Sequence, residues 1–261
     1  IDITDIPLNS LDDKGTMLYE EFSELGPTNG LIAYYPLNGD ANDYSGNNNH
    51  GVVTGAVPAG GIHGQAYEFN GTSSYILLPG QSYKVTNQIT LSAWAYRDNW
   101  QATSSERIIS CTESGGWQLG FNDSAGYVSM PCYIAGVGYK IALYPLSSIT
   151  TQGWHHLAGT FDGSNLKLYL DGELVSSVSS GGSSIGYHPT NGVFIGAEAT
   201  SHATIPTGGY WNGKICDMRI YNRALSQEEV NILYNVTKPN AIPMQLSSDG
   251  IVYPAGELKE V

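Results

Sequence analysis

LKLYLDGELVSSV, residues 166–178, alternates apolar and polar side chains on both sides of an Asp-Gly pair. Its three leucines are separated by lysine and tyrosine, which is the period of a strand with one buried face. Asp171 and Gly172 supply the positive φ angles that a tight hairpin turn needs, and a second strand-like run follows. The stretch therefore predicts a β-hairpin with one face turned toward a core.

Comparable short segments fill the chain from residue 31 to residue 235. They are rich in Ile, Val, Leu, Tyr or Thr and are bounded by Gly, Asn, Asp or Ser, as strands are. Strands about ten residues apart, with no helices between them, predict an antiparallel β-sandwich of the jelly-roll type. A parallel α/β sheet is excluded because it needs a crossover helix between strands. The clearest segments besides the hairpin are LIAYYPL (31–37), YEFNGTSSYILLP (67–79), ITLSAWAY (89–96), RIISCTE (107–113), GWQLGFN (116–122), YVSMPCYIAG (127–136), WHHLAGTFD (154–162), VFIGAE (193–198) and KICDMRIYN (214–222).

One helix is predicted near the C-terminal end of the sandwich. Ser226 can cap it, Glu229 completes a capping box, and Val230, Leu233 and Tyr234 form an apolar stripe. The predicted fold is thus all-β, an antiparallel sandwich with one short C-terminal helix and extended terminal segments. Its parts are an N-terminal extension (1–30), the sandwich (31–236) and a C-terminal linker and assembly segment (237–261).

Charge and composition restrict the partners. The chain of 261 residues has a net charge of −13 and only 11 basic residues, so it lacks the Lys/Arg footprint of a nucleic-acid binder. It also lacks an apolar run of about 20 residues, so we expect no membrane insertion. Cys111, Cys132 and Cys216 have no metal-ligand spacing; they are either reduced thiols or include a Cys111–Cys132 bridge.

Five stretches, in order, resemble the laminin-G-like, concanavalin A-like lectin/glucanase family of jelly rolls. The resemblance covers about 200 residues and implies the sandwich fold. It does not imply one function, because this sandwich hosts lectins, adhesion modules, enzymes and structural proteins. The stretches are LIAYYPLNGDANDYSGNNNHG, AYEFNGTSSYILLP, ITLSAWAY, QGWHHLAGTFDGSNLKLYLDGELV and GKICDMRIYNRALSQEEVNILYN.

An acidic, glycine-rich loop, NGDANDYSGNNNHG (38–51), offers hard oxygen atoms of the kind that Ca²⁺ binds. The family resemblance implies that calcium joins this loop to the closing strand, with the ligands Asp40, Asp43, Asn38 or the Gly39 carbonyl, and Asp217. The alternative is an Asn/Asp/Gly turn whose side chains bind their own backbone. Relatives often carry a second acidic patch where this chain has Asn70 and Ser74, which leaves a second metal there in doubt.

Neither paired carboxylates nor a nucleophile triad stands out in the sequence. Glycoside hydrolysis needs two carboxylates, and the Glu-x-Asp-x-x-Glu string of the glucanase branch is absent. We therefore expect that the chain is not an enzyme.

Aromatic residues in predicted loops are the candidates for sugar recognition, which uses an aromatic face and a few directed polar groups. The alternative for each tryptophan is packing against its neighbours. Trp94 and Trp154 lie in predicted strands, and we expect them in the core. The candidate ligand-binding residues are Tyr96, Trp100, Trp117, Tyr139, His188 and Trp211.

The two ends of the chain resemble each other. IPLNSLDDKGTMLYEEFSEL (6–25) and IPMQLSSDGIVYPAGELKEV (242–261) align without a gap. They indicate either a segment that recurs between modules or strand addition between subunits, unless the match is coincidence. The second segment also loosely resembles the terminal segments of viral tail-fibre proteins. Candidate assembly residues are Tyr19, Phe22, Leu25, Tyr253, Leu258 and Val261.

Together these observations predict a non-catalytic, calcium-stabilised module that binds a glycan or cell-surface polysaccharide. We expect it in a homo-oligomer or fibre that is extracellular or part of a virion. Two alternatives stay open at this point: a purely structural, self-assembling subunit that binds no glycan, and a polysaccharide-active enzyme.

Overall fold

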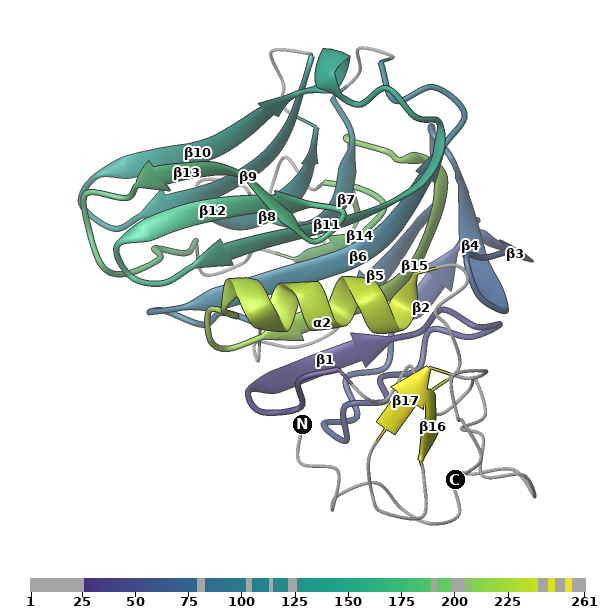
Figure 1. The fold of residues 1–261 in the computed structure, drawn as a ribbon. Helices are drawn as coiled ribbons and strands as arrows, with labels where there is room; N and C mark the ends of the chain where they lie inside the picture. The colour runs from purple at the N-terminus through teal and green to yellow at the C-terminus, as the bar shows by residue number, and fades with distance from the viewer. Residues whose placement is uncertain are drawn as a thin grey trace.

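Two antiparallel sheets packed face to face form the body of the molecule (Figure 1). The computed structural model describes residues 26–78, 83–101, 105–112, 115–121, 126–188, 192–198, 205–206, 208–238, 244–246 and 252–254. The all-β sandwich predicted from the sequence is confirmed.

The first sheet has eight strands. In spatial order they are β13 (Glu173–Ser179), β12 (Asn165–Leu170), β11 (Gly153–Phe161), β6 (Ile89–Arg97), β15 (Asn212–Tyr221), β4 (Gln65–Asn70) and β3 (Val57–Gly60), and β1 (Leu31–Tyr35) also pairs with β15.

The second sheet has seven strands, and two shorter elements complete the fold. The strand order is β10 (Gly138–Pro145), β9 (Tyr127–Ile134), β8 (Gly116–Phe121), β7 (Arg107–Thr112), β14 (Val193–Ile195), β5 (Tyr75–Leu78) and β2 (Val52–Thr54). A 3₁₀ turn, η3 (Leu146–Ser148), follows β10, and a separate hairpin joins β16 (Met244–Leu246) to β17 (Val252–Pro254).

The predicted hairpin is β12–β13, and its turn is tied to the next strand. Asp171 adopts a φ of 50° at the turn. Its carboxylate accepts a hydrogen bond from the backbone N–H of His156 (2.9 Å) and lies 2.7 Å from Nδ1 of His155, both on β11. The Asp-Gly pair therefore closes one hairpin and fixes a third strand beside it.

One predicted segment divides between the two sheets. YEFNGTSSYILLP contains β4 of the eight-stranded sheet and β5 of the seven-stranded sheet. The chain turns between them at Asn70, whose side-chain oxygen accepts hydrogen bonds from the backbone N–H groups of Thr72, Ser73 and Ser74. Asn70 here serves as a turn-forming acceptor, a role that an amide oxygen fills without a metal.

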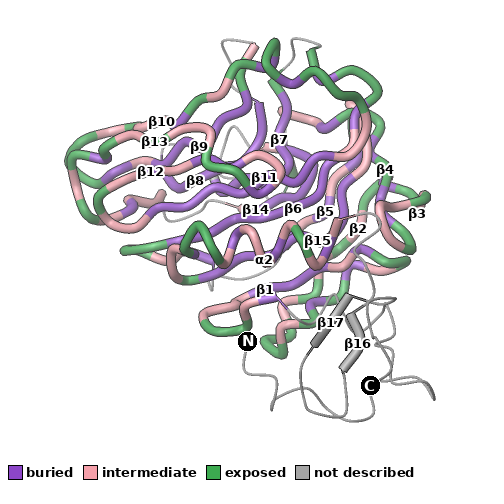
Figure 2. Tube along the Cα trace, viewed as in Figure 1, coloured by how far each residue is buried: buried purple, intermediate pink, exposed green. Residues whose placement is uncertain are grey.

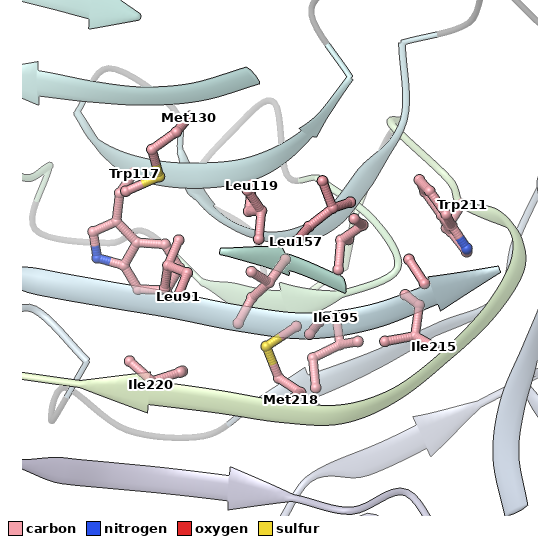
Figure 3. Packing of buried hydrophobic residues seen from close by; sticks show 14 of the residues in the cluster. Leu91, Trp117, Leu119, Met130, Leu157, Ile195, Trp211, Ile215, Met218 and Ile220 are labelled. Atoms are coloured by element: carbon pink, nitrogen blue, oxygen red, sulfur yellow. The ribbon is translucent and has the colours of Figure 1, made fainter. Parts of the chain in front are cut away.

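The core lies between the inner faces of the two sheets (Figure 2). Leu91, Leu157 and Ile215 project from the eight-stranded sheet toward Trp117 and Leu119 of the seven-stranded sheet (Figure 3). All five side chains are fully buried. Burying large apolar side chains on both inner faces is the main favourable term in folding such a sandwich.

Helix α2 (Gln227–Thr237) covers part of the outer face of the eight-stranded sheet (Figure 1). The predicted capping box is present, with Ser226 and Glu229 exchanging hydrogen bonds. Trp94 lies beneath the helix: its indole stacks on Tyr234 at 5.7 Å and donates a 2.7 Å hydrogen bond to Oγ1 of Thr237. In the described part of the chain, no helix is long and apolar enough to span a bilayer.

The three cysteines are buried thiols. Trp117 on β8 pairs with Cys111 on one side and with Cys132 on the other, so the two cysteines are separated by a whole strand. Two strand spacings amount to about 10 Å, which is beyond the roughly 7 Å limit between bridged Cα atoms. The alternative of a Cys111–Cys132 bridge is therefore wrong, and burial raises the pKa of the Cys111 thiol to about 12.

Candidate functional site

The predicted calcium loop is held by hydrogen bonds within the protein. The carboxylate of Asp43 accepts from the backbone N–H groups of Tyr34 (3.0 Å), Ser45 (2.9 Å) and Asn49 (3.0 Å). Burial opposes ionisation of Asp43, but these donors outweigh it and lower the pKa of the carboxyl. Asp40 accepts from Asn42 and from the Tyr44 hydroxyl. These contacts are those of a self-capping Asx turn.

The other proposed calcium ligands are also bonded within the protein. The Asn38 side-chain oxygen accepts from the Gln65 N–H at 2.9 Å, and the Gly39 carbonyl accepts from the Tyr67 hydroxyl at 3.1 Å. Asp217 forms an ion pair with Arg219 at 3.0 Å.

Tyr34 makes the link that the sequence assigns to calcium. Its backbone N–H binds Asp43 in the loop, and its phenol hydrogen-bonds to Asp217 on the closing strand. Among the described residues, no group of three or more His, Cys, Asp or Glu side chains is placed to hold a metal ion. The donor set does not fit Ca²⁺, which needs six to eight converging oxygens.

Three of the predicted ligand-binding residues belong to the core. Trp100, Trp117 and Trp211 are each 0% exposed, so no sugar reaches their rings, and the prediction is wrong for these residues. In the sequence, Trp100 is surrounded by the polar residues Arg97, Asp98, Asn99 and Gln101. Its indole instead turns inward, 6.1 Å from the Trp211 ring and 5.0 Å from the His155 ring.

The remaining candidates lie in different parts of the sandwich. Tyr139 on β10 is 44% exposed, packs edge-on against Tyr133, and accepts a hydrogen bond from the Gly115 N–H. His188 is half-buried beyond β13, and its carbonyl accepts from the Lys84 ammonium. Tyr96 is the last but one residue of β6 on the eight-stranded sheet, so the six candidates do not form one site.

The candidate assembly residues cannot be placed in the same way. Tyr19, Phe22, Leu25, Leu258 and Val261 lie outside the described residues. Tyr253 falls in β17, where it pairs with Gln245 of β16. The assembly role of these six residues stays a prediction.

Tyr96 belongs to a row of side chains that crosses four strands. It pairs with Trp154 on β11 and with Lys214 on β15, and Lys214 pairs with Glu68 on β4. Residues that face each other across antiparallel strands point to the same side of the sheet. The row thus lies on the outer face, two residues along β6 from Trp94, where helix α2 no longer covers the sheet.

A depression of about 170 Å³ opens at this row. It lies where β6 ends and β15 begins, with β4 on its far side. The aromatic ring of Tyr96 meets the Trp154 ring at 5.5 Å and the Lys214 ammonium at 5.0 Å. The lining residues are Glu68, Tyr96, Arg97, Asp98, Asn99, Asn212, Gly213 and Lys214.

Buried contacts fix one wall of the depression, the start of β15. The Arg97 guanidinium forms an ion pair with Glu106 at 2.9 Å and lies 4.8 Å from the Phe121 ring. The other Glu106 oxygen accepts from the Asn212 N–H at 3.0 Å, which joins the end of β6 to the start of β15. Gly213 completes this wall; with a φ of 151°, it leaves no room for a side chain beside the Tyr96 carbonyl.

Trp100 fixes the opposite wall, the loop that follows β6. Its indole donates to the Gly153 carbonyl at 2.8 Å, and its backbone N–H donates to the Gln152 side chain at 3.2 Å. The preceding residues, Asp98 and Asn99, are exposed above it. Trp100 therefore acts as a buried anchor for the loop and has no contact with the opening.

The lining combines one aromatic ring with hydrogen-bonding groups of every kind. Tyr96 donates a 2.8 Å hydrogen bond to Asp98, and that carboxylate raises the pKa of the phenol, which stays protonated. Carboxylates accept, ammonium donates, and the amides of Asn99 and Asn212 do both. The volume is below the 300–1,000 Å³ usual for drug-sized ligands, and it suits one small, hydroxylated ring.

Glu68, Asn212 and Lys214 were not among the predicted site residues. The signal that unites them is the pairing register of β4, β15 and β6, and a single sequence does not give a register between strands so far apart. Asp98 and Asn99 are polar neighbours of Trp100 in the sequence, but the aromatic residue that lines the depression beside them is the half-buried Tyr96.

Comparisons with known proteins agree with this architecture. The binding domain of Paraclostridial Mosquitocidal Protein 1 is similar with a TM-score of 0.62 and 19% identity, over 82% of this chain and 52% of that chain. Domain 4 of AbnA, a GH43 extracellular arabinanase from Geobacillus stearothermophilus in complex with arabinotriose, gives 0.59 and 22%, over 78% of this chain and 98% of that one.

A third similar structure is the binding domain of Botulinum Neurotoxin DC in complex with SialylT, with a TM-score of 0.62 and 14% identity, over 81% of this chain and 52% of that chain. The chain thus spans about half the length of the two toxin binding domains. At these identities the likeness shows the fold alone. No curated protein matches the sequence.

A family-level match covers more than half of the chain. Residues 70–231 match the sequence model of the concanavalin A-like lectin/glucanases superfamily, a range that includes β5 to β15, most of the depression and the start of helix α2. The resemblance seen in the ordered strand motifs is therefore confirmed, and the chain belongs to the concanavalin A-like lectin/glucanases superfamily.

Proposed function

We propose that the chain is a non-catalytic glycan-binding module and that the depression beside Tyr96 holds one sugar residue of its ligand. The observation that carries this proposal is the depression itself. A volume of about 170 Å³ is bordered by an aromatic ring, two amides, two carboxylates and an ammonium. Sugar hydroxyls donate and accept together, so they need this mixture at one place.

The walls support the same proposal. The Arg97–Glu106 pair and the Trp100 anchor hold both sides of the opening through buried contacts. A site fixed in advance loses little conformational entropy when its ligand binds. One of the similar structures, the arabinanase domain, is a complex with arabinotriose by its own description.

A glycan array followed by titration calorimetry tests the proposal. Tyr96→Ala removes the ring and its hydrogen bond to Asp98, and we expect it to weaken binding at least about tenfold, as loss of an aromatic anchor does. Tyr139→Ala is the matched control, because it removes an exposed tyrosine from the other sheet. Binding lost in Tyr139→Ala and kept in Tyr96→Ala would move the site to β10.

Two other outcomes would replace the proposal. Hydrolysis of a bound glycan that disappears in Glu68→Gln would indicate an enzyme, since Glu68 and Asp98 are two carboxylates at one opening. Binding to no glycan, together with polymerisation that rises with protein concentration, would indicate a purely structural subunit.

We also propose that the module works within an extracellular or virion assembly, as a homo-oligomer or part of a fibre. The matched segments 6–25 and 242–261 support this setting. The second of these segments contains β16 and β17, which pair with each other as a hairpin.

A further inference from the structure

We propose that the depression selects uncharged glycans, and that Glu68 and Asp98 are the residues that exclude anionic ones. This inference rests on the proposed function, because it concerns the ligand of the same site. It adds a chemical class: neutral sugars in preference to sugars that carry a carboxylate.

The first argument is the balance of charge around the opening. Glu68 and Asp98 are exposed, and neither forms an ion pair within the described part of the chain. Arg97 is 4% exposed and its charge is matched by Glu106 at 2.9 Å. Lys214 is the one remaining cation of the lining, so the opening carries one net negative charge.

The second argument is the position of the Lys214 ammonium. It lies over the Tyr96 ring at 5.0 Å, where the negative face of the ring attracts it. A carboxylated ligand that reached for this ammonium would have to enter between Glu68, its cross-strand partner, and Asp98, which is bonded to the same tyrosine. Like charges placed together at an interface are a known basis for rejecting a wrong partner.

The third argument is that a neutral sugar uses both carboxylates. A hydroxyl that donates to an ionised carboxylate makes a hydrogen bond about twice as strong as a neutral one. The amides of Asn99 and Asn212 can accept from or donate to the remaining hydroxyls. The same two side chains therefore favour hydroxyl groups and disfavour anions.

The field of the surrounding protein acts in the same direction. Residues 31–236 contain six more acidic than basic side chains. A negative surface slows the approach of anionic polymers and leaves neutral ones unaffected, and the effect weakens as salt shortens the Debye length.

The test uses pairs of glycans that differ only in charge, for example a galactose oligomer and the galacturonic acid oligomer of equal length, and lactose with and without a terminal sialic acid. Affinities are measured by calorimetry at about 0.01 M and about 1 M salt, where the Debye length falls from about 30 Å to about 3 Å. We expect the neutral member to bind at least about tenfold more tightly at low salt, and the ratio to shrink at high salt.

The double variant Glu68→Gln/Asp98→Asn should shrink the same ratio at low salt. The control double variant Glu173→Gln/Glu228→Gln removes two exposed charges outside the depression and should leave the ratio as it is. An equal shift in both variants would assign the selectivity to net charge and overturn the role of the two residues.

Two further outcomes separate the inference from the function beneath it. A carboxylated glycan bound as tightly as its neutral partner at low salt would overturn the selectivity while the glycan-binding function stands. Failure of every glycan to bind the wild-type chain would overturn the proposed function and the selectivity with it.

Discussion

Single polar side chains hold together segments that the sequence separates widely. Asp43 binds backbone N–H groups around its own loop, Asp171 binds β11 from the hairpin turn, and Glu106 joins β6 to β15. A carboxylate that accepts two or three N–H groups is satisfied without a metal or a catalytic partner. Acidic residues in this sandwich therefore mostly organise backbone, and Glu68 and Asp98 differ because they face the opening.

His156 gives the first prediction, because it is a buried titratable side chain. Its Nε2 lies 2.9 Å from the Ser92 hydroxyl, and its Nδ1 has no hydrogen-bond partner among the described residues. Burial lowers the pKa of His156 to about 4; nearby Asp171 partly opposes this and Arg219 adds to it. The folded protein therefore holds the imidazole neutral, while the unfolded chain protonates it near pH 6.5.

The folded-state pKa is the lower one, so the contribution of His156 to stability is complete above pH 6.5 and is lost as the pH falls from 6.5 to about 4. The loss is about 3 kcal/mol in the free energy of unfolding. Urea unfolding at pH 7 and pH 4 measures it, and in His156→Gln the difference between the two pH values should shrink by that amount. His50→Gln, at an exposed histidine, is the control; an equal pH dependence in wild type and His156→Gln would contradict the assignment.

At the scale of elements, the extent of helix α2 decides which part of the outer face of the eight-stranded sheet stays uncovered. The helix packs its Tyr234 on Trp94 and binds the same indole through Thr237. Two residues further along β6, Tyr96 is outside this cover and borders the depression. The site is thus the part of the outer face that the helix leaves uncovered.

The N-cap of α2 gives the second prediction. Ser226 accepts from the Glu229 N–H, and its own N–H donates to the Glu229 carboxylate. Ser226→Ala should lower the free energy of unfolding by about 1 kcal/mol, because helix N–H groups lose their acceptor. Ser226→Asp, which restores an acceptor, should recover most of the loss in urea unfolding; equal losses in both variants would show that the cap is not the cause.

Elements with local signals could be predicted from the sequence, and the site could not. The hairpin at Asp171, the helix after Ser226 and the short strands are written in neighbouring residues. The depression depends on Tyr96, Lys214 and Glu68 lying side by side, which only the strand register decides. The prediction that Trp100 binds a ligand was wrong for the same reason. Its polar neighbours can be read in the sequence, whereas the direction of its ring depends on how the core packs.

At the scale of the whole molecule, a tyrosine links the opening loop to the closing strand at the place where the sequence predicts a metal. The loop and the closing strand meet through Tyr34, which binds Asp43 and Asp217 with two different groups. We therefore expect the same melting temperature in millimolar CaCl₂ and in EDTA, since an ion that does not bind the folded state cannot stabilise it. Differential scanning calorimetry measures this; a rise of several degrees with calcium, absent with magnesium, would restore the metal site.

The ordered motifs predicted the family and the sandwich because many strands contribute to them, so one misplaced segment changes little. The calcium prediction depended on a few side chains and on one contact between distant parts of the chain. That contact exists, but a tyrosine makes it. A single sequence therefore predicts the overall architecture more reliably than it predicts which residues make any one contact.

The described sandwich begins and ends on the same side. Gly26 packs against Leu233 of helix α2, and the helix ends at Thr237, about one turn further on. Because the chain enters and leaves the described sandwich at neighbouring positions, the domain can be inserted into a surface loop of another protein and project from that surface. A domain inserted in this way would add no length to the protein that carries it.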